Sequence, residues 1–146
     1  MALSQDLKEF LRLFALNEVE YLLIGGFAVA AHGHPRYTKD IDLWIRQTPE
    51  NAQRVAKCLE LFGFASLGIS ETDLLEPGVV IQLGYPPNRI DLLTSPSGVN
   101  FDECYPKRAR TLLEGMEVDV IDLASLRQNK QASGRPQDLA DLDKLR

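Results

Sequence analysis

The fold is decided by residues 24–45, which read IGGFAVAAHGHPRYTKDIDLWI. The apolar run Tyr21–Ile24 stops at Gly25-Gly26, which is typical of a buried strand that enters a tight turn. Residues 27–32 favour a short helix, and a loop rich in Gly, Pro and Arg follows over 32–39. Apolar and polar residues then alternate over 40–45, as in a half-buried strand. This stretch predicts a strand, a turn, a short helix, a loop and a second strand.

The second predicted strand begins with two aspartates, Asp40 and Asp42. Residues i and i+2 of a strand project to the same face, so two negative charges lie within several ångströms of each other. A hard divalent cation relieves such repulsion, and the pair therefore indicates a metal site. The alternative is that Asp40 caps the loop and Asp42 is a solvated strand residue.

A third carboxylate, Asp91, interrupts another apolar run, residues 89–94. If this strand lies beside the strand of Asp40, three carboxylates converge, and they suffice for one Mg²⁺ and, with substrate phosphates, for a second. Asp91 is then the expected general base. The alternative is a salt bridge from Asp91 to Arg89 or Arg36.

Gly25 and Gly26 stand where a strand turns into a helix. Glycines at such a turn allow the backbone to approach a phosphate, and the free N–H groups of the helix start face it. The alternative is a plain turn. The chain contains neither a GxGxxG fingerprint nor a GxxxxGK[ST] loop, which excludes the dinucleotide-binding and P-loop classes.

The rest of the chain alternates helical and strand-like patterns. Helical spacing of apolar residues predicts helices over 3–14 and 50–62, the latter capped by Thr48-Pro49. Residues 78–83 and 89–94 predict an antiparallel hairpin, since the connection is too short for a helix. Beyond them we expect a helix over 101–113, a strand over 118–121 and helices over 122–130 and 136–146. The fold class is α+β: a small mixed sheet flanked by helices.

Length and composition fit one globular domain over residues 1–146. Of the 146 residues, 45% are hydrophobic, and no apolar run reaches the length of a membrane span. The N-terminus lacks a secretory pattern, so we expect a cytoplasmic protein without membrane contact. The net charge of −5 argues against coating nucleic acid with a general basic surface. Cys58 and Cys104 stand apart, which indicates neither zinc nor a disulfide framework.

Several residues leave two interpretations open. His32 and His34 form a weak H-x-H zinc pattern, and loop polarity or phosphate contact is the alternative. Trp44 either stacks on a base or packs in the core beneath the site. The basic cluster of Lys107, Arg108 and Arg110 is a solvated helix face or a nucleic-acid footprint.

Residues 24–33, 36–43 and 89–93 resemble the motifs of the DNA polymerase β-like nucleotidyltransferase superfamily. They are similar in particular to its small members related to the nucleotidyltransferase toxins of abortive-infection toxin–antitoxin systems. Residues 126–142 resemble the distal Lys…Arg-x-x-Asp motif of this family. The resemblance implies a minimal nucleotidyltransferase fold, with the C-terminal helices over the site.

The resemblance also implies residue roles. The metal ligands and catalytic residues are Asp40, Asp42 and Asp91. The residues implied in nucleotide binding are Gly25, Gly26, Arg36, Thr38, Lys130, Arg135 and Asp138. Lys130 is expected to contact phosphate, with Asp138 orienting Arg135 or Lys130. The alternative is a surface pair between Arg135 and Asp138.

The implied activity is transfer of a nucleoside monophosphate (NMP) from a nucleoside triphosphate (NTP) to a hydroxyl acceptor, with Mg²⁺ or Mn²⁺ as cofactor. The acceptor is a tRNA or other RNA, a protein side chain or a small molecule, and a cognate antitoxin or toxin is a further expected partner. The length of the chain disfavours drug-modifying members of the superfamily, which generally add a second domain. The rival functions are a non-catalytic nucleotide-binding or toxin-neutralising module, and a phosphohydrolase that uses water as acceptor.

Overall fold

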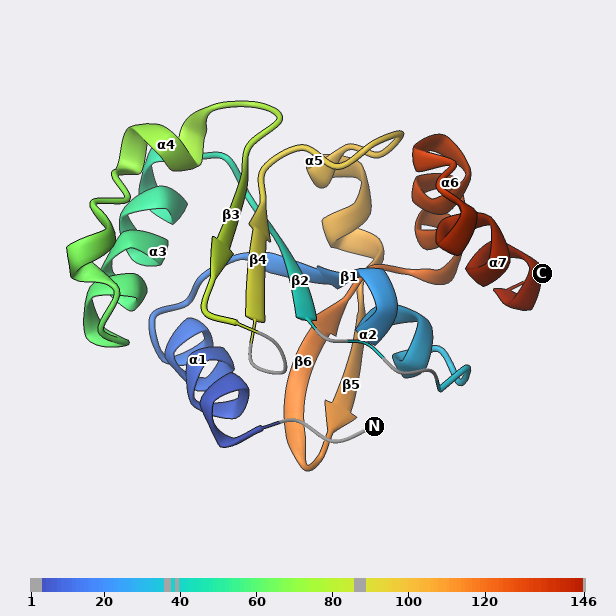
Figure 1. Cartoon of the computed structure of the whole chain (residues 1–146), viewed down its shortest axis with the longest axis horizontal. Helices are drawn as coiled ribbons and strands as arrows, with labels where there is room; N and C mark the ends of the chain where they lie inside the picture. The colour runs from blue at the N-terminus through green and yellow to red at the C-terminus, as the bar shows by residue number, and fades with distance from the viewer. Residues whose placement is uncertain (1–3, 36–37, 39, 86–88, 146) are drawn as a thin grey trace.

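The computed structural model describes residues 4–35, 38, 40–85 and 89–145. Its centre is a six-stranded sheet with the order β3-β4-β2-β1-β6-β5 (Figure 1). The β2·β4 and β1·β6 pairs are parallel and the other three are antiparallel, so the sheet is mixed, as the sequence predicts. The strands are β1 (Tyr21–Ile24), β2 (Asp40–Ile45), β3 (Val80–Leu83), β4 (Arg89–Leu93), β5 (Ala109–Leu113) and β6 (Met116–Val120).

Helices flank the sheet, and α1 and α3 lie on the other side of the molecule from α6 and α7 (Figure 1). The α-helices are α1 (Gln5–Leu16), α2 (Gly25–Ala31), α3 (Pro49–Leu61), α4 (Glu71–Leu75), α5 (Phe101–Cys104), α6 (Leu123–Ser133) and α7 (Pro136–Leu145). Two 3₁₀ turns are η1 (Ala65–Leu67) and η2 (Tyr105–Lys107). The predicted Thr48 cap is confirmed, since its side chain accepts a hydrogen bond from the Asn51 N–H at 3.3 Å. No helix of the described part of the chain is both long and apolar enough to cross a membrane.

One face of the sheet forms the hydrophobic core. The side chains of Ile41, Leu43 and Ile45 on β2 project to this face and are at most 1% exposed. The residues between them project to the opposite face. Helix α1 covers this face, and its Phe14 ring lies 5.6 Å from that of Tyr21. The apolar positions of β2 therefore bind the strand to the core, and its aspartates are left on the opposite face.

The predicted helix over 101–113 is wrong. Helix α5 ends at Cys104, a 3₁₀ turn with Pro106 follows, and residues from Ala109 onward form strand β5. Glu114 and Gly115 both have positive φ (51° and 81°) and join β5 to β6 as a two-residue hairpin turn. Proline cannot continue a helix interior, and this hairpin lets β5 pair along β6.

The basic residues of this segment therefore do not form the predicted solvated helix face. The guanidinium of Arg108 lies 4.0 Å from the centre of the Tyr105 ring. Arg110 projects from β5 and pairs with Asp119 at 2.9 Å and with Glu117 at 3.3 Å. Both arginines therefore contact other side chains of the protein, whereas Lys107 is exposed.

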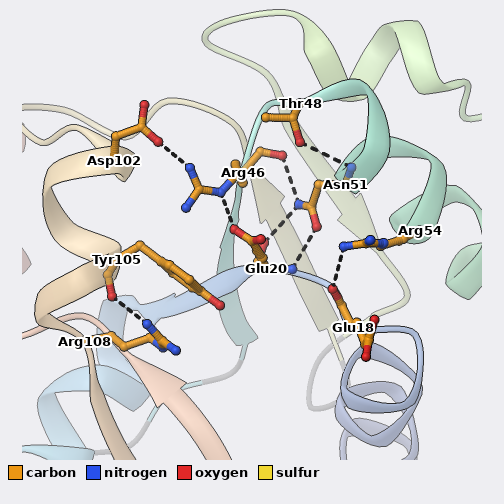
Figure 2. A network of polar contacts seen from close by, with 9 residues as sticks. All are labelled: Glu18, Glu20, Arg46, Thr48, Asn51, Arg54, Asp102, Tyr105 and Arg108. Atoms are coloured by element: carbon orange, nitrogen blue, oxygen red, sulfur yellow. Dashed lines mark hydrogen bonds and ion pairs between the residues drawn. The ribbon is translucent and has the colours of Figure 1, made fainter.

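A polar network holds the end of β2 that lies farthest from Asp40 (Figure 2). Arg46 forms ion pairs with Glu20 and Asp102, and its guanidinium lies 4.7 Å from the centre of the Phe101 ring. The Asn51 amide oxygen accepts a hydrogen bond from the Glu20 N–H at 2.8 Å. These contacts join β1, β2, α3 and α5, and so fix the strand that carries the aspartates.

Candidate active site

Three carboxylates meet on the polar face of the sheet. Strand β4 lies beside β2 in parallel, and Asp42 is the register partner of Asp91. One ligand oxygen each from Asp40, Asp42 and Asp91 lies within 4.8 Å of the others. The two strands that carry the three aspartates are therefore adjacent, as the predicted metal site requires.

The carboxylates repel one another in a partly buried place. Burial, followed by the charges of Asp40 and Asp91, raises the pKa of Asp42 to about 7. Burial also raises the pKa of Asp91, although hydrogen bonds from Arg89 oppose the rise. A group of oxygen donors that are costly to ionise together suits a divalent cation.

Arg89, which the sequence predicts only as a salt-bridge partner of Asp91, also lines the pocket of the three carboxylates. Its Nη2 lies 2.5 Å from Asp40 Oδ2 and 3.0 Å from Asp91 Oδ2, and its Nε lies 3.1 Å from Asp91 Oδ1. The predicted salt bridge and the predicted cluster therefore coexist. The sequence does contain a signal for this role of Arg89. Arg89 precedes Asp91 by two residues on a strand, so both side chains project to the same face.

The glycine pair forms the first turn of α2, which begins two residues earlier than predicted. Gly25 has φ +70°, and a Cβ there would lie 2.1 Å from Asp42 Oδ2. A side chain at position 25 would thus occupy the place of the Asp42 carboxylate. Gly26 is buried and also lines the pocket described below.

The loop before β2 contributes Thr38. Its hydroxyl lies 3.1 Å from the Asp40 carbonyl oxygen and 3.4 Å from Asp40 Oδ1, to both of which it donates. Arg36, the other loop residue predicted to bind nucleotide, lies outside the described residues. His32 is not directed at the carboxylates: its Nε2 is in hydrogen-bond contact with the Ile121 carbonyl oxygen at 2.8 Å.

Trp44 packs in the core rather than at the pocket. It is 2% exposed, its ring meets that of Phe101 edge-on at 5.1 Å, and its indole N–H donates to the Thr94 carbonyl at 3.3 Å. Of the two interpretations of Trp44, the structure supports core packing.

Helices α6 and α7 bring the distal motif to the same site. Lys130 Nζ lies 3.1 Å from Asp138 Oδ1 and 3.0 Å from Asp141 Oδ2, and Arg135 Nε lies 2.8 Å from Asp138 Oδ2. Burial raises the pKa of Asp138, but hydrogen bonds from Arg135, Ser133 and Lys130 outweigh it and lower the pKa to about 2. Asp138 therefore contacts both cations, and the pair is not an isolated surface contact.

Two side-chain contacts attach α6 to the loop after β4. The Asn129 amide donates to the Ser97 carbonyl at 2.9 Å, and the Gln128 amide donates to the Gly98 carbonyl at 2.7 Å. These contacts fix the C-terminal helices beside the strand that carries Asp91. The predicted position of these helices over the site is confirmed.

The carboxylates and the distal motif open into one pocket of about 930 Å³. Two of its sides differ in chemistry. The helix wall comprises Asn129, Lys130, Ser133, Arg135, Gln137 and Asp138. The β3 wall comprises Val80, Gln82, Leu93, Ser95, Pro96 and Ser97. The three carboxylates, Arg89, Thr38 and the glycine pair lie in the same pocket.

The chain matches no protein-family model and no curated protein sequence. Its fold is similar to that of a protein from Thermotoga maritima assigned as a nucleotidyltransferase, TM1012, with a TM-score of 0.62 and 15% identity over 94% of this chain and 88% of that one. The chain has the nucleotidyltransferase fold. This confirms the predicted fold class.

Two further solved structures share the fold. ANT(2″)-Ia, in complex with adenylyl-2″-tobramycin, has a TM-score of 0.64 and 14% identity over 95% of this chain and 84% of that one. The lincosamide antibiotic adenylyltransferase LnuA, with lincomycin bound, has a TM-score of 0.60 and 16% identity over 99% of this chain and 96% of that one. The LnuA chain is therefore about as long as this one, so the length of this chain does not count against drug-modifying members of the superfamily.

Proposed function

We propose that the chain is a divalent-metal-dependent nucleotidyltransferase of EC 2.7.7 type, which transfers NMP from an NTP to a hydroxyl group. The observation that carries this proposal is the cluster of Asp40, Asp42 and Asp91, whose oxygens lie within 4.8 Å of one another in an open pocket. The shared fold with two adenylyltransferases supports it.

The three aspartates are the proposed ligands of Mg²⁺, or of Mn²⁺ in its place. They fit such a cation because their oxygens are hard donors and because their charges repel one another. Burial is the larger cause of the raised pKa of Asp42, and the charges of Asp40 and Asp91 raise it further. A bound divalent cation would offset the triphosphate charge and lower the proton affinity of the acceptor hydroxyl.

The other residues of the pocket are proposed to bind the phosphates and to orient the metal ligands. Asp91 is the proposed acceptor of the hydroxyl proton, since its buried carboxylate has a raised pKa. Lys130 and Arg135 of the helix wall are proposed to face the phosphates, held in place by Asp138. Thr38 orients Asp40 through its hydroxyl.

The remaining predicted nucleotide contacts belong to the same proposal. Arg36 is proposed to bind phosphate oxygens through its guanidinium fork. Gly25 and Gly26 are proposed to leave room beside the carboxylates, and the contact between Gly25 and Asp42 supports this role.

We propose a small molecule as acceptor. In the similar structures the adenylylated or bound compounds are tobramycin and lincomycin, both small molecules. Transfer to tRNA or to a protein side chain, ATP as the donor, a cognate toxin or antitoxin and a cytoplasmic location stay predictions from the sequence.

Incubation of the purified protein with each α-labelled NTP, Mg²⁺ and separate pools of small molecules, tRNA and protein tests the proposal. We expect acceptor-dependent release of pyrophosphate and label on a small molecule. Asp91→Asn removes both, whereas Glu60→Gln, an exposed position on α3, changes neither.

The other outcomes separate the rival functions. Free labelled NMP in place of a labelled acceptor identifies a phosphohydrolase. Binding of Mg²⁺–NTP without turnover identifies a non-catalytic nucleotide-binding module. Absence of NTP binding in calorimetry contradicts the proposal.

A further inference from the structure

The β3 wall continues the row of catalytic carboxylates toward the edge of the sheet. Gln82 is the register partner of Asp91, and Val80 is the register partner of Leu93. Register partners on adjacent strands project to the same face, so Gln82 and Val80 lie on the face of Asp91. Because β3 is the edge strand, this side of the pocket is open, and Val80 is 54% exposed.

The chemistry of the β3 wall is uncharged. It combines three apolar side chains, Val80, Leu93 and Pro96, with amide and hydroxyl groups from Gln82, Ser95 and Ser97. All three described cationic side chains of the pocket lie elsewhere: Arg89 on the carboxylates, and Lys130 and Arg135 on the helix wall.

This division assigns the two substrates to different sides. The phosphates of an NTP are stabilised by cations. Of the two walls only the helix wall carries cationic side chains, and its Arg135 is 78% exposed, whereas Lys130 is buried against Asp138 and Asp141. The β3 wall offers no such partner among its described residues, but it adjoins Asp91, the proposed proton acceptor. The side of the pocket left for the hydroxyl acceptor is therefore the β3 wall.

The β3 wall has no charged side chain among its described residues to pair with a charged acceptor. An RNA backbone requires lysines or arginines along its path, and the whole chain has a net charge of −5. A polycationic acceptor requires free carboxylates. The four described aspartates of the pocket either form the metal cluster or, in the case of Asp138, pair with Lys130 and Arg135.

We infer that the β3 wall binds the acceptor, and that the acceptor is an uncharged small molecule with a hydroxyl group and an apolar portion. This inference rests on the proposed function. The apolar portion packs on Val80 and Leu93, and the polar groups bond to Gln82 and the serines. The pocket of about 930 Å³ includes both walls, so the NTP and the acceptor share this volume.

The reaction at this wall is a simple displacement. The acceptor oxygen forms a bond to the α-phosphorus of the NTP, and the bond from that phosphorus to the bridging oxygen of the β-phosphate breaks. Pyrophosphate leaves with the electron pair of the broken bond. The hydroxyl proton passes to Asp91.

The test is acceptor-dependent label transfer with three probe sets: uncharged hydroxyl compounds from glucosides to steroid alcohols, tobramycin as a polycation, and tRNA. Val80→Lys places a charge on the exposed β3 wall. We expect it to raise the KM for the uncharged acceptor about tenfold or more, because the lysine must be desolvated on binding.

The matched control is Leu112→Lys, a second exposed apolar position (69%) on the opposite edge strand, β5. It is expected to change neither the acceptor KM nor the NTP dissociation constant. Three results overturn the inference if the protein still binds NTP. They are label on tobramycin or tRNA alone, no label on any uncharged probe, and an unchanged acceptor KM in Val80→Lys. Loss of NTP binding by the wild type instead overturns the proposed function.

Discussion

Asp42→Asn is expected to make the metal-free protein more stable while removing its activity. Burial and the charges of Asp40 and Asp91 raise the pKa of Asp42 from 3.8 to about 7. A carboxyl with a raised pKa in the folded state destabilises the fold increasingly as pH rises from about 4 to about 7. The neutral amide removes this cost.

The size of the effect follows from the pKa. Each pKa unit corresponds to about 1.4 kcal/mol, so the rise amounts to about 4 kcal/mol above neutral pH. Asp42 is only partly buried and the amide must form new hydrogen bonds, so we expect a net gain of about 2 kcal/mol. For a chain of this length, that gain raises Tm by about 4–8 °C.

Thermal unfolding in EDTA at pH 5 and pH 8 measures this effect. The gain is expected to be larger at pH 8, and Glu60→Gln, an exposed carboxylate-to-amide change, is expected to show none. Calorimetry with Mg²⁺–NTP and a turnover assay then measure the loss of function.

Two results would refute the reasoning. A variant that is no more stable than the wild type at pH 8 shows that the three carboxylates do not repel one another in the folded protein. Near-normal turnover by Asp42→Asn shows that this carboxylate does not hold a catalytic cation.

Three further changes have distinct expected outcomes. Gly25→Ala places a Cβ 2.1 Å from a carboxylate oxygen of Asp42 at φ +70°, so we expect loss of turnover and a stability loss of about 1–2 kcal/mol; normal turnover would contradict the contact. Gly98→Ala, at φ +76° and with its Cβ 2.4 Å from a methyl carbon of α6, is expected to destabilise the fold by about 2–4 kcal/mol in urea unfolding; Gly63→Ala, at φ +97° with open space, should cost only the backbone strain. Hydrogen bonds lower the pKa of Asp138 to about 2 despite its burial, so this carboxylate stabilises the fold fully above pH 4 and loses that contribution as pH falls toward 2. Asp138→Asn is expected to reduce the loss of unfolding free energy between pH 4 and pH 2 by about 1–2 kcal/mol. An unchanged pH dependence in this variant would refute the pairing.

Much of the fold was predictable from local patterns. The apolar run Tyr21–Ile24, the alternation over 40–45 and the Thr48-Pro49 cap each express a preference of the chain within a few residues, and the structure contains the predicted elements. The helix predicted over 101–113 was wrong because pairing between β5 and β6 overrode a weak helical spacing.

The sequence also predicted that the three aspartates come together, but it predicted their arrangement only in part. The face shared by Asp40 and Asp42 follows from strand periodicity alone. The contact of Arg89 with Asp40 has no such local cause, because the two residues belong to strands far apart in the chain. The same holds for the buried pairing of Lys130 with Asp141 across two helices.

The sequence by itself determined which residues carry charge on an otherwise apolar strand, where the chain turns, and which helices begin at a cap. Only the tertiary structure decided that Asp42 lies opposite Asp91, that Gly25 touches Asp42 and that an uncharged wall adjoins the cluster. The physical reason is the range of the forces involved. Backbone sterics and periodicity act over a few residues, whereas strand register and helix docking depend on which distant surfaces bury each other best.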